Sequence, residues 1–363
     1  MSKARQLADL GNQVDDGAIT GSNMVVNGAM TVAQRSTSET GLGNGTNSYK
    51  TVDRYTTYIS GLGTWTQSQD TNAPEGFGHS LKVLCTAADA SPAASDRMLI
   101  QTKLEGQDVQ SLGFGNTSNT YTVSFYVKSN VTGTYILEQY GDSASATGNN
   151  ISTAYTINSA NTWERKVITL NVDSGAMTAN NTSGLVITFW LGSGTNYTSG
   201  TLNTSWSSPA AADRAVGQVN LASATNNYWQ ITGVCLNVGD SAIDFPHESY
   251  GDTLAKCQRY CQKIATGTDA GFGMYHSYTS SSSYAPIQLP VTMRATPSAS
   301  ITNSNAVTLF IGGTNYNPSA TTLINASPSS VEVKFGTTGN ATAGDTGWYR
   351  LQTAFTMILN AEI

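Results

Sequence analysis

Charged residues are scarce in this sequence: Asp, Glu, Lys and Arg make up 12% of its 363 residues, and the formal net charge is −6. A nucleic-acid groove needs clustered Lys and Arg, whereas the 18 basic residues here are scattered, so we expect no nucleic-acid partner. No apolar run reaches the roughly 18 residues of a membrane span, so we expect no membrane insertion. No apolar stretch follows the basic N-terminus as it would in a secretory signal, which favours synthesis in a cytoplasm.

Cysteine and histidine are also few, with four and three residues. Cys85 and Cys235 lie in strand-like runs, and Cys257 and Cys261 lie four apart, so no disulfide framework is indicated. A zinc site would need two further ligands near the last pair, and no histidine has ligand spacing. We therefore predict buried thiols, no metal site and no cofactor.

Catalytic sequence motifs are missing as well. The sequence contains no GxSxG, P-loop or HExxH, and no glycine-rich dinucleotide fingerprint. We therefore expect that the protein is not an enzyme. Glycan cleavage by two carboxylates stays an alternative, because such a pair needs only to meet in space and leaves no sequence motif.

Turn residues and aromatic residues are abundant: the chain has 35 Gly, 17 Tyr, 9 Phe and 6 Trp. This mixture is typical of antiparallel sheets with many tight turns. The stretch TYTVSFYVK alternates apolar and polar residues, as a strand with one buried face does. We predict an all-β protein with a jelly-roll β-sandwich over residues 23–249. Its expected strands are residues 24–32, 52–60, 80–85, 98–104, 120–128, 133–140, 164–172, 184–191 and 228–238.

The most convincing helical pattern covers residues 250–266. Ser249 and Asp252 resemble a capping box, and Gly267 is a plausible stop. Apolar residues then recur at spacings of four and three, which predicts one packing stripe. The stripe consists of Tyr250, Leu254, Cys257, Cys261 and Ile264. It packs either as a connector helix on a neighbouring sheet or as a short seam between copies of the chain.

The two ends of the chain differ in pattern. Residues 267–363 contain strand-like runs at 284–293, 306–311, 330–335 and 348–361, which predict a smaller C-terminal β-sandwich. Residues 2–10 form a short helical pattern, and residues 11–22 read as a tether.

Exposed tyrosines of the C-terminal domain are the best candidates for ligand contact. Sugars bind to aromatic faces beside hydroxyls and amides, and this domain has all three on its loops. The alternative is that each tyrosine packs at a sheet rim or a subunit interface with its hydroxyl in water. The candidates are Tyr275, Tyr278, Tyr284 and Tyr316.

Several stretches, in order, resemble a class of bacteriophage virion proteins, commonly tail fibres. MVVNGAMTVAQRS followed by TVDRY resembles their NGxxxxxQR and DRW/Y strands, and YTVSFYVKSNVTGTY with NTWERKVITL is similar to the middle of their carbohydrate-binding-module-like jelly roll. DFPHESYGDTLAKCQRYCQ resembles their FExRxYGxELxxCQRYY helix, and LPVTMRATP their PVxMRxxP strand. His247, Ser249 and Cys261 depart from this pattern, where Glu, Arg and Tyr are usual.

The resemblance implies a virion component of the tail, usually a homotrimer, made in the host cytoplasm and without established catalytic residues. It implies that the N-terminus binds phage tail proteins and that the C-terminal domain adheres to a host cell-surface glycan. Alternatives are a capsid decoration or head-fibre protein, and a glycan-degrading tailspike. The candidate residues for virion attachment are Lys3, Arg5, Leu7 and Leu10.

Overall fold

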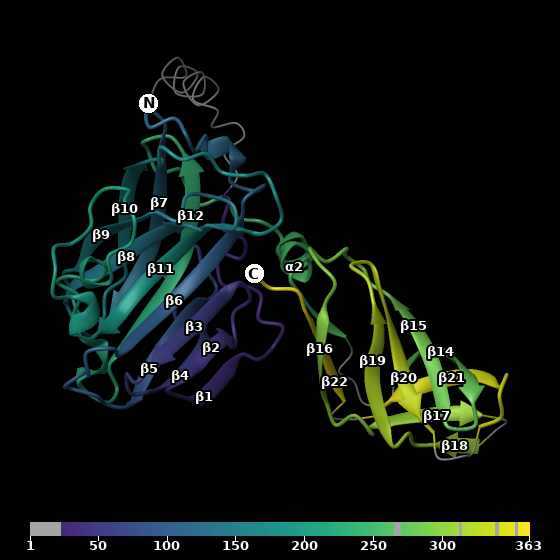
Figure 1. Ribbon diagram of the computed structural model, residues 1–363. Coiled ribbons are helices and arrows are strands. Elements are labelled where there is room, and N and C mark those ends of the chain that lie inside the picture. The colour runs from purple at the N-terminus through teal and green to yellow at the C-terminus, as the bar shows by residue number, and fades with distance from the viewer. Residues whose placement is uncertain (1–22, 265–269, 312–313, 338–340, 353–354) are drawn as a thin grey trace. The chain divides into compact units, whose positions relative to one another are not determined.

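The structure is a computed structural model that describes residues 23–264, 270–311, 314–337, 341–352 and 355–363 (Figure 1). It is built almost entirely of antiparallel strands, with one α-helix, α2 (Tyr250–Gln258), among the described residues. Two compact units meet in the sequence between Thr253 and Leu254. The all-β prediction is therefore confirmed. The expected attachment residues Lys3, Arg5, Leu7 and Leu10 lie outside the described residues.

The first unit consists of two six-stranded antiparallel sheets. One has the order β1 (Ser38–Leu42), β4 (Thr64–Asp70), β5 (Ser80–Ala87), β12 (Tyr228–Val238), β7 (Thr120–Ser129) and β10 (Glu164–Asn171). The other has the order β2 (Thr46–Tyr49), β3 (Tyr55–Ser60), β6 (Arg97–Glu105), β11 (Ser183–Ser193), β8 (Gly133–Gly141) and β9 (Asn150–Ile157). The chain crosses repeatedly from one sheet to the other, as in a jelly roll. Short 3₁₀ helices lie at Gln110–Leu112, Thr195–Tyr197, Ala211–Asp213 and Leu221–Ser223.

The inner faces of these two sheets form one core. Tyr121, Val123, Phe125 and Val127, the residues that the alternation in β7 predicted to share a face, are all fully buried. The ring of Phe125 meets Phe189 of β11 edge-on, with centroids 5.2 Å apart. Period-two alternation thus identified the core face correctly.

Residues 24–32, expected as a strand, contain a bend at 24–25 and a turn at 26–29, and they form no strand. The side chain of Asn27 replaces a strand partner: its Nδ2 donates to the carbonyls of Val32 and Asp53, and its Oδ1 accepts from the Val32 amide at 3.0 Å. Asn27 also has a positive φ of 60°. Asn side chains compete with ladder hydrogen bonds in this way, and the local turn therefore overrides the apolar pattern.

The NG, QR and DRY segments meet around Asp53. Its carboxylate accepts from the Gln34 amide at 3.0 Å and from Gln34 Nε2 at 2.5 Å, and Arg35 Nη1 lies 3.8 Å away. The neighbouring Arg54 donates to the Lys103 carbonyl at 2.5 Å. The residues of these motifs therefore stabilise the start of the first unit by binding to one another.

The second unit is a smaller β-sandwich. Its seven-stranded sheet has the order β18 (Thr314–Tyr316), β17 (Val307–Ile311), β21 (Thr346–Leu351), β14 (Ala270–Thr279), β15 (Ser282–Gln288), β20 (Ser330–Gly336) and β19 (Ala320–Ala326). Its three-stranded sheet has the order β13 (Cys261–Ile264), β22 (Thr356–Asn360) and β16 (Ser298–Thr302). Both sheets contribute to one core, for example Phe335 and Tyr349 from the first and Met357 and Leu359 from the second.

Helix α2 is shorter than the sequence predicts. Its start is confirmed, because the Asp252 amide donates to Ser249 Oγ and that hydroxyl donates to Asp252 Oδ2 at 2.7 Å. The helix ends at Gln258, however, and Cys261 and Ile264 lie in β13, paired with Asn360 and Met357 of β22.

The expected stripe is therefore divided between two elements. On α2, Tyr250 is 61% exposed, Leu254 is half-buried and Cys257 is buried. A short apolar run fits either a helix turn or a strand, and in this chain pairing with β22 decides in favour of the strand. Among the described residues, no helix is long and apolar enough to cross a membrane.

Candidate functional site

The outer face of the seven-stranded sheet carries an unusual group of exposed side chains. Along β14, Tyr275 and Ser277 are buried, whereas Met274 and Tyr278, on the opposite face, are 72% and 69% exposed. Along β21, Tyr349 is buried and Trp348 is 48% exposed. Alternation on a half-buried sheet therefore places large apolar residues on both faces here.

Strand register brings these residues together. Trp348 pairs with Met274 of β14 and with Phe310 of β17, and His276 pairs with Tyr284 of β15. The rings of Phe310 and Trp348 stack with centroids 3.7 Å apart and planes 10° from parallel. Tyr278 meets Tyr284 edge-on with centroids 6.0 Å apart. We call this group the aromatic face; its residues are Met274, His276, Tyr278, Tyr284, Phe310 and Trp348.

The concentration of apolar residues on this sheet is what makes it a candidate site. Six large apolar side chains are exposed in the part of the chain that the structure describes, and Met274, Tyr278, Trp348 and Ile324 all belong to this sheet. Single exposed apolar residues need no explanation, but a contiguous patch usually marks a binding surface.

Polar groups border the aromatic face. The Arg350 guanidinium lies over the Phe310 ring, with its carbon 5.3 Å from the centroid. Lys334 of β20 pairs with Tyr284, and the neighbouring Glu332 accepts from Asn325 Nδ2 at 2.6 Å. Flat rings next to hydroxyls, amides and charges of both signs suit a ligand with apolar and polar edges, such as a saccharide.

Two of the four tyrosines predicted from the sequence lie on this face. Tyr278 and Tyr284 are in contact there, but Tyr275 is only 3% exposed and its hydroxyl donates to the Phe310 carbonyl at 3.1 Å. Burial, together with the charge of Asp345 and the nearby Tyr316, raises the pKa of Tyr275 to about 12. Tyr316 is half-buried and packs against the core. Tyr275 therefore contributes to the core and cannot contact a large ligand.

Sequence reasoning missed Phe310, Trp348, Met274 and His276. One signal was available: in GMYHSYT, Met274, His276 and Tyr278 occupy every second position, which places all three on one side of a strand. No such pattern points to Phe310 and Trp348, because they meet only through long-range strand pairing.

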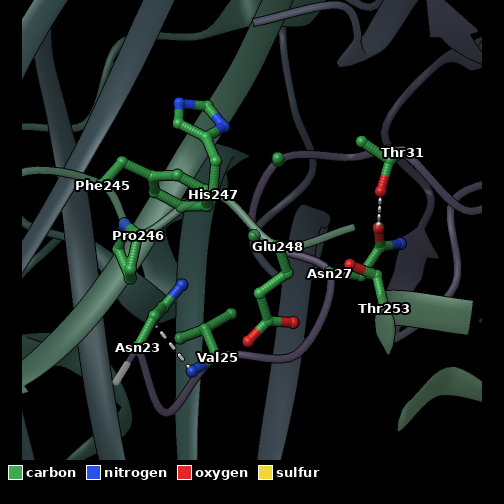
Figure 2. A pocket seen from close by; sticks show the side chains of 11 residues that line it. Asn23, Val25, Asn27, Thr31, Phe245, Pro246, His247, Glu248 and Thr253 are labelled. Atoms are coloured by element: carbon green, nitrogen blue, oxygen red, sulfur yellow. Dashed lines mark hydrogen bonds between the residues drawn. The ribbon is translucent and has the colours of Figure 1, made fainter. Parts of the chain in front are cut away.

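A small pocket in the first unit lies between the segment near Asn27 and the segment 245–248 (Figure 2). Its volume is about 50 Å³, enough for a few water molecules but too small for a sugar ring. Figure 2 shows Glu248 pointing into the space beside Asn23 and Val25, while the His247 ring points away. Asn23 is tied to β12 through the Val234 carbonyl and the Leu236 amide. The residues around this pocket therefore link the start of the first unit to its end.

Several buried carboxylates have structural partners. Glu138 accepts from Arg214, Trp190 and Asn150, and Asp53 accepts from Gln34. Among the described residues, no three His, Cys, Asp or Glu side chains gather in a way that could hold a metal ion.

No protein-family model matches the sequence, and no curated protein sequence matches it. Among solved structures, the enzymatically active domain of tailspike protein 4 from bacteriophage CBA120 is 15% identical with a TM-score of 0.32, over 60% of this chain and 21% of that chain. The C-terminal family 22 carbohydrate-binding module of Clostridium thermocellum Xyn10B is 14% identical with a TM-score of 0.30, over 55% and 98%. The family 11 carbohydrate-binding module of C. thermocellum Lic26A-Cel5E is 11% identical with a TM-score of 0.28, over 55% and 95%. These are likenesses to other proteins, and they transfer no activity to this chain.

Proposed function

We propose that this protein is a non-catalytic, glycan-binding adhesin of a phage particle, a tail fibre that attaches to the host surface through the aromatic face. The observation that carries the proposal is the stack of half-buried Phe310 on exposed Trp348, which is continuous with Met274 and lies on the same sheet face as Tyr278 and Tyr284. Burying exposed aromatic surface against the apolar side of a sugar ring is favourable, and the polar border offers hydrogen bonds to its hydroxyls.

The proposed assembly is a homotrimer fixed to the tail by residues 1–22. Three copies of a weak site on one particle give strong attachment, because each later binding step is intramolecular. A flat aromatic surface suits this mechanism, since it needs no deep pocket. The sequence resemblance to tail-fibre proteins motivates the virion location, and the aromatic face motivates the ligand.

Binding to a panel of immobilised bacterial surface polysaccharides tests the proposal. We expect Tyr278→Ala and Trp348→Ala each to weaken binding by about tenfold or more, equivalent to ~1.4 kcal/mol, as for aromatic hot spots. Thr322→Ala is the matched control, because Thr322 is exposed on β19 of the same sheet but lies outside the aromatic face. Unchanged binding by both aromatic variants would exclude this face as the glycan site.

A subunit interface is the competing use of the aromatic face. The solution mass of the full chain, compared with 38.2 kDa for one copy, separates the two uses. We expect Trp348→Ala to leave the mass unchanged. Dissociation of the assembly by this variant would assign the face to subunit contacts.

Two further experiments test the location and the absence of catalysis. Locating residues 1–22 in intact particles distinguishes a tail fibre from a capsid decoration or head fibre. Incubating the protein with a bound polysaccharide and assaying new reducing ends tests for cleavage. Release of oligosaccharides would replace the adhesin with a glycan-degrading tailspike.

A further inference from the structure

A larger hollow lies in the first unit, where the outermost strands of its two sheets, β9 and β10, are found. Its volume is about 400 Å³, within the range of about 300–1,000 Å³ typical of small-molecule sites. We call it the edge hollow. Its lining residues are Thr117, Ile151, Thr169, Leu170, Asn171, Val172, Asp173, Ser174, Thr204, Ser205 and Trp206.

The apolar part of the edge hollow is held rigidly. Trp206 is half-buried, and its Nε1 donates to the Asn171 carbonyl at 2.8 Å. The Trp206 ring also meets Phe114 edge-on, with centroids 5.9 Å apart. Half-buried Leu170 and buried Ile151 extend this apolar surface. A fixed indole offers contact area without the entropy cost of ordering a mobile side chain.

The polar part consists of short side chains that are open to solvent. Thr117, Asn171, Ser174 and Thr204 are exposed and supply hydroxyl and amide groups. These groups both donate and accept hydrogen bonds, as the hydroxyls of a sugar do.

Asp173 is the one ionisable residue among those that line the edge hollow, and it is 2% exposed. Thr147 Oγ1 donates to its Oδ2, and Asn149 Nδ2 lies 3.1 Å from the same oxygen. Oδ1 has only long contacts, 3.3 Å to Asn149 Nδ2 and 3.4 Å to Ser174 Oγ. A carboxylate has about four acceptor positions, and a ligand hydroxyl can replace the two long contacts of Oδ1.

We infer that the edge hollow is a second saccharide site, selective for an uncharged sugar residue. The indole and Leu170 would contact the apolar side of the ring, while the Thr, Ser and Asn side chains and Asp173 bond to its hydroxyls. No cation lines the hollow, so a sugar carboxylate would face the charge of Asp173 without compensation. The inference stands on residues of the first unit and does not require the aromatic face to bind glycan.

Fluorine NMR on the full chain labelled with fluorotryptophan tests the inference, with Trp206→Phe identifying the Trp206 resonance. The probes are glucose, galactose, N-acetylglucosamine and glucuronic acid. We expect at least one of the three neutral sugars to shift the Trp206 resonance with a Kd of about 1–10 mM. Glucuronic acid should bind at least about tenfold more weakly, because of repulsion by Asp173.

Variants of the rim assign the response to the edge hollow. Asn171→Ala and Ser174→Ala should each weaken binding about fivefold by removing a hydrogen-bonding side chain. Val167→Ala is the matched control, since Val167 is 51% exposed on β10, the strand of Asn171, and does not line the hollow. Trp348→Ala should leave this response unchanged, which separates the hollow from the aromatic face.

Three results would overturn the inference. The first is the absence of any shift of the Trp206 resonance with all three neutral sugars. The second is equal binding of glucuronic acid. The third is sugar binding that survives both rim substitutions undiminished, because the sugar would then occupy another part of the protein.

Discussion

Arg214 binds Glu138 through two guanidinium nitrogens: Nε lies 2.7 Å from Oε1, and Nη2 lies 2.9 Å from Oε2. Glu138 is fully buried on β8 and also accepts from Trp190 Nε1 at 2.9 Å and Asn150 Nδ2 at 2.8 Å. Burial alone would lower the pKa of Arg214, but the hydrogen bond and charge of Glu138 outweigh it and raise that pKa. Arg214 belongs to the long segment 194–227 between β11 and β12, so this pair fastens the segment onto the sheet.

Replacing Arg214 alone should destabilise the first unit strongly. Arg214→Ala leaves the Glu138 charge buried with its main partner removed, which costs about 3 kcal/mol. The double variant Glu138→Gln with Arg214→Met should lose less, because no charge remains buried. Urea unfolding midpoints measure both effects. Equal stability of Arg214→Ala and the wild type would show that the pair does not fasten the segment.

Gly28 should not tolerate a side chain. A Cβ there would lie 2.1 Å from the Val234 carbonyl oxygen, and the Val234 amide bonds back to the Gly28 carbonyl at 3.0 Å. Because backbone must move, we expect Gly28→Ala to cost about 2 kcal/mol or more. Gly78→Ala is the control, since no atom lies within 4 Å of its Cβ position, and its stability should change by less than about 1 kcal/mol. Thermal unfolding of the two variants measures both changes in stability.

The thiols should be unreactive in the folded protein. All four cysteines are buried. Burial raises the pKa of Cys235 to about 11, although Arg165 lowers it somewhat, and burial also raises the pKa of Cys85. The reactive thiolate of these two residues is therefore rare at pH 8. Ellman's reagent should label the four thiols only as urea unfolds the protein, and rapid labelling of the native protein would contradict their burial.

Glu164 should make stability depend on pH. Burial raises its pKa, but hydrogen bonds from Lys166, the Ser159 amide and Asn158 outweigh burial and lower the pKa below its ordinary value. A carboxyl whose pKa is lower in the folded state stabilises that state above its unfolded pKa of about 4.3, and the contribution disappears as pH falls through the folded pKa.

Glu164→Gln tests this dependence. We expect the variant to lose less than about 1 kcal/mol at pH 7, because solvent screens this group, and almost nothing at pH 3, where the wild-type carboxyl is also neutral. Glu75→Gln, at an exposed position, is the matched control. Urea titrations at the two pH values give the comparison. An equal loss at both values would mean that the charge of Glu164 plays no part.

Local pattern predicted several strands with clear alternation, missed others such as β14, and failed where side chains or pairing intervened. Strand β12 spans the predicted residues 228–238, and the core face of β7 was also predicted correctly. Strands β1 and β2 escaped notice because their segments, SETGL and TNSY, are short and polar. The side-chain hydrogen bonds of Asn27 stabilise a turn where the first strand was expected. Pairing with β22 places Cys261 in a strand, where a helix was expected.

The candidate site was predictable only in part. Abundant tyrosine near the serine tract indicated Tyr278 and Tyr284 as candidates. Composition could not distinguish them from Tyr275, whose side chain lies on the buried face of the strand. The sheet face that a side chain occupies depends on strand register, and a shift of one residue would exchange the buried and the exposed side chains.

The sequence by itself determined an all-β chain with two β-sandwiches, because period-two alternation and frequent turn residues leave few other ways to bury its apolar side chains. Only the tertiary structure decided which strands became neighbours. That choice stacked Phe310 on Trp348, brought Arg214 to Glu138, and placed Trp206 and Asp173 in the lining of one hollow. Such contacts join residues far apart in the chain, and no local pattern encodes their register.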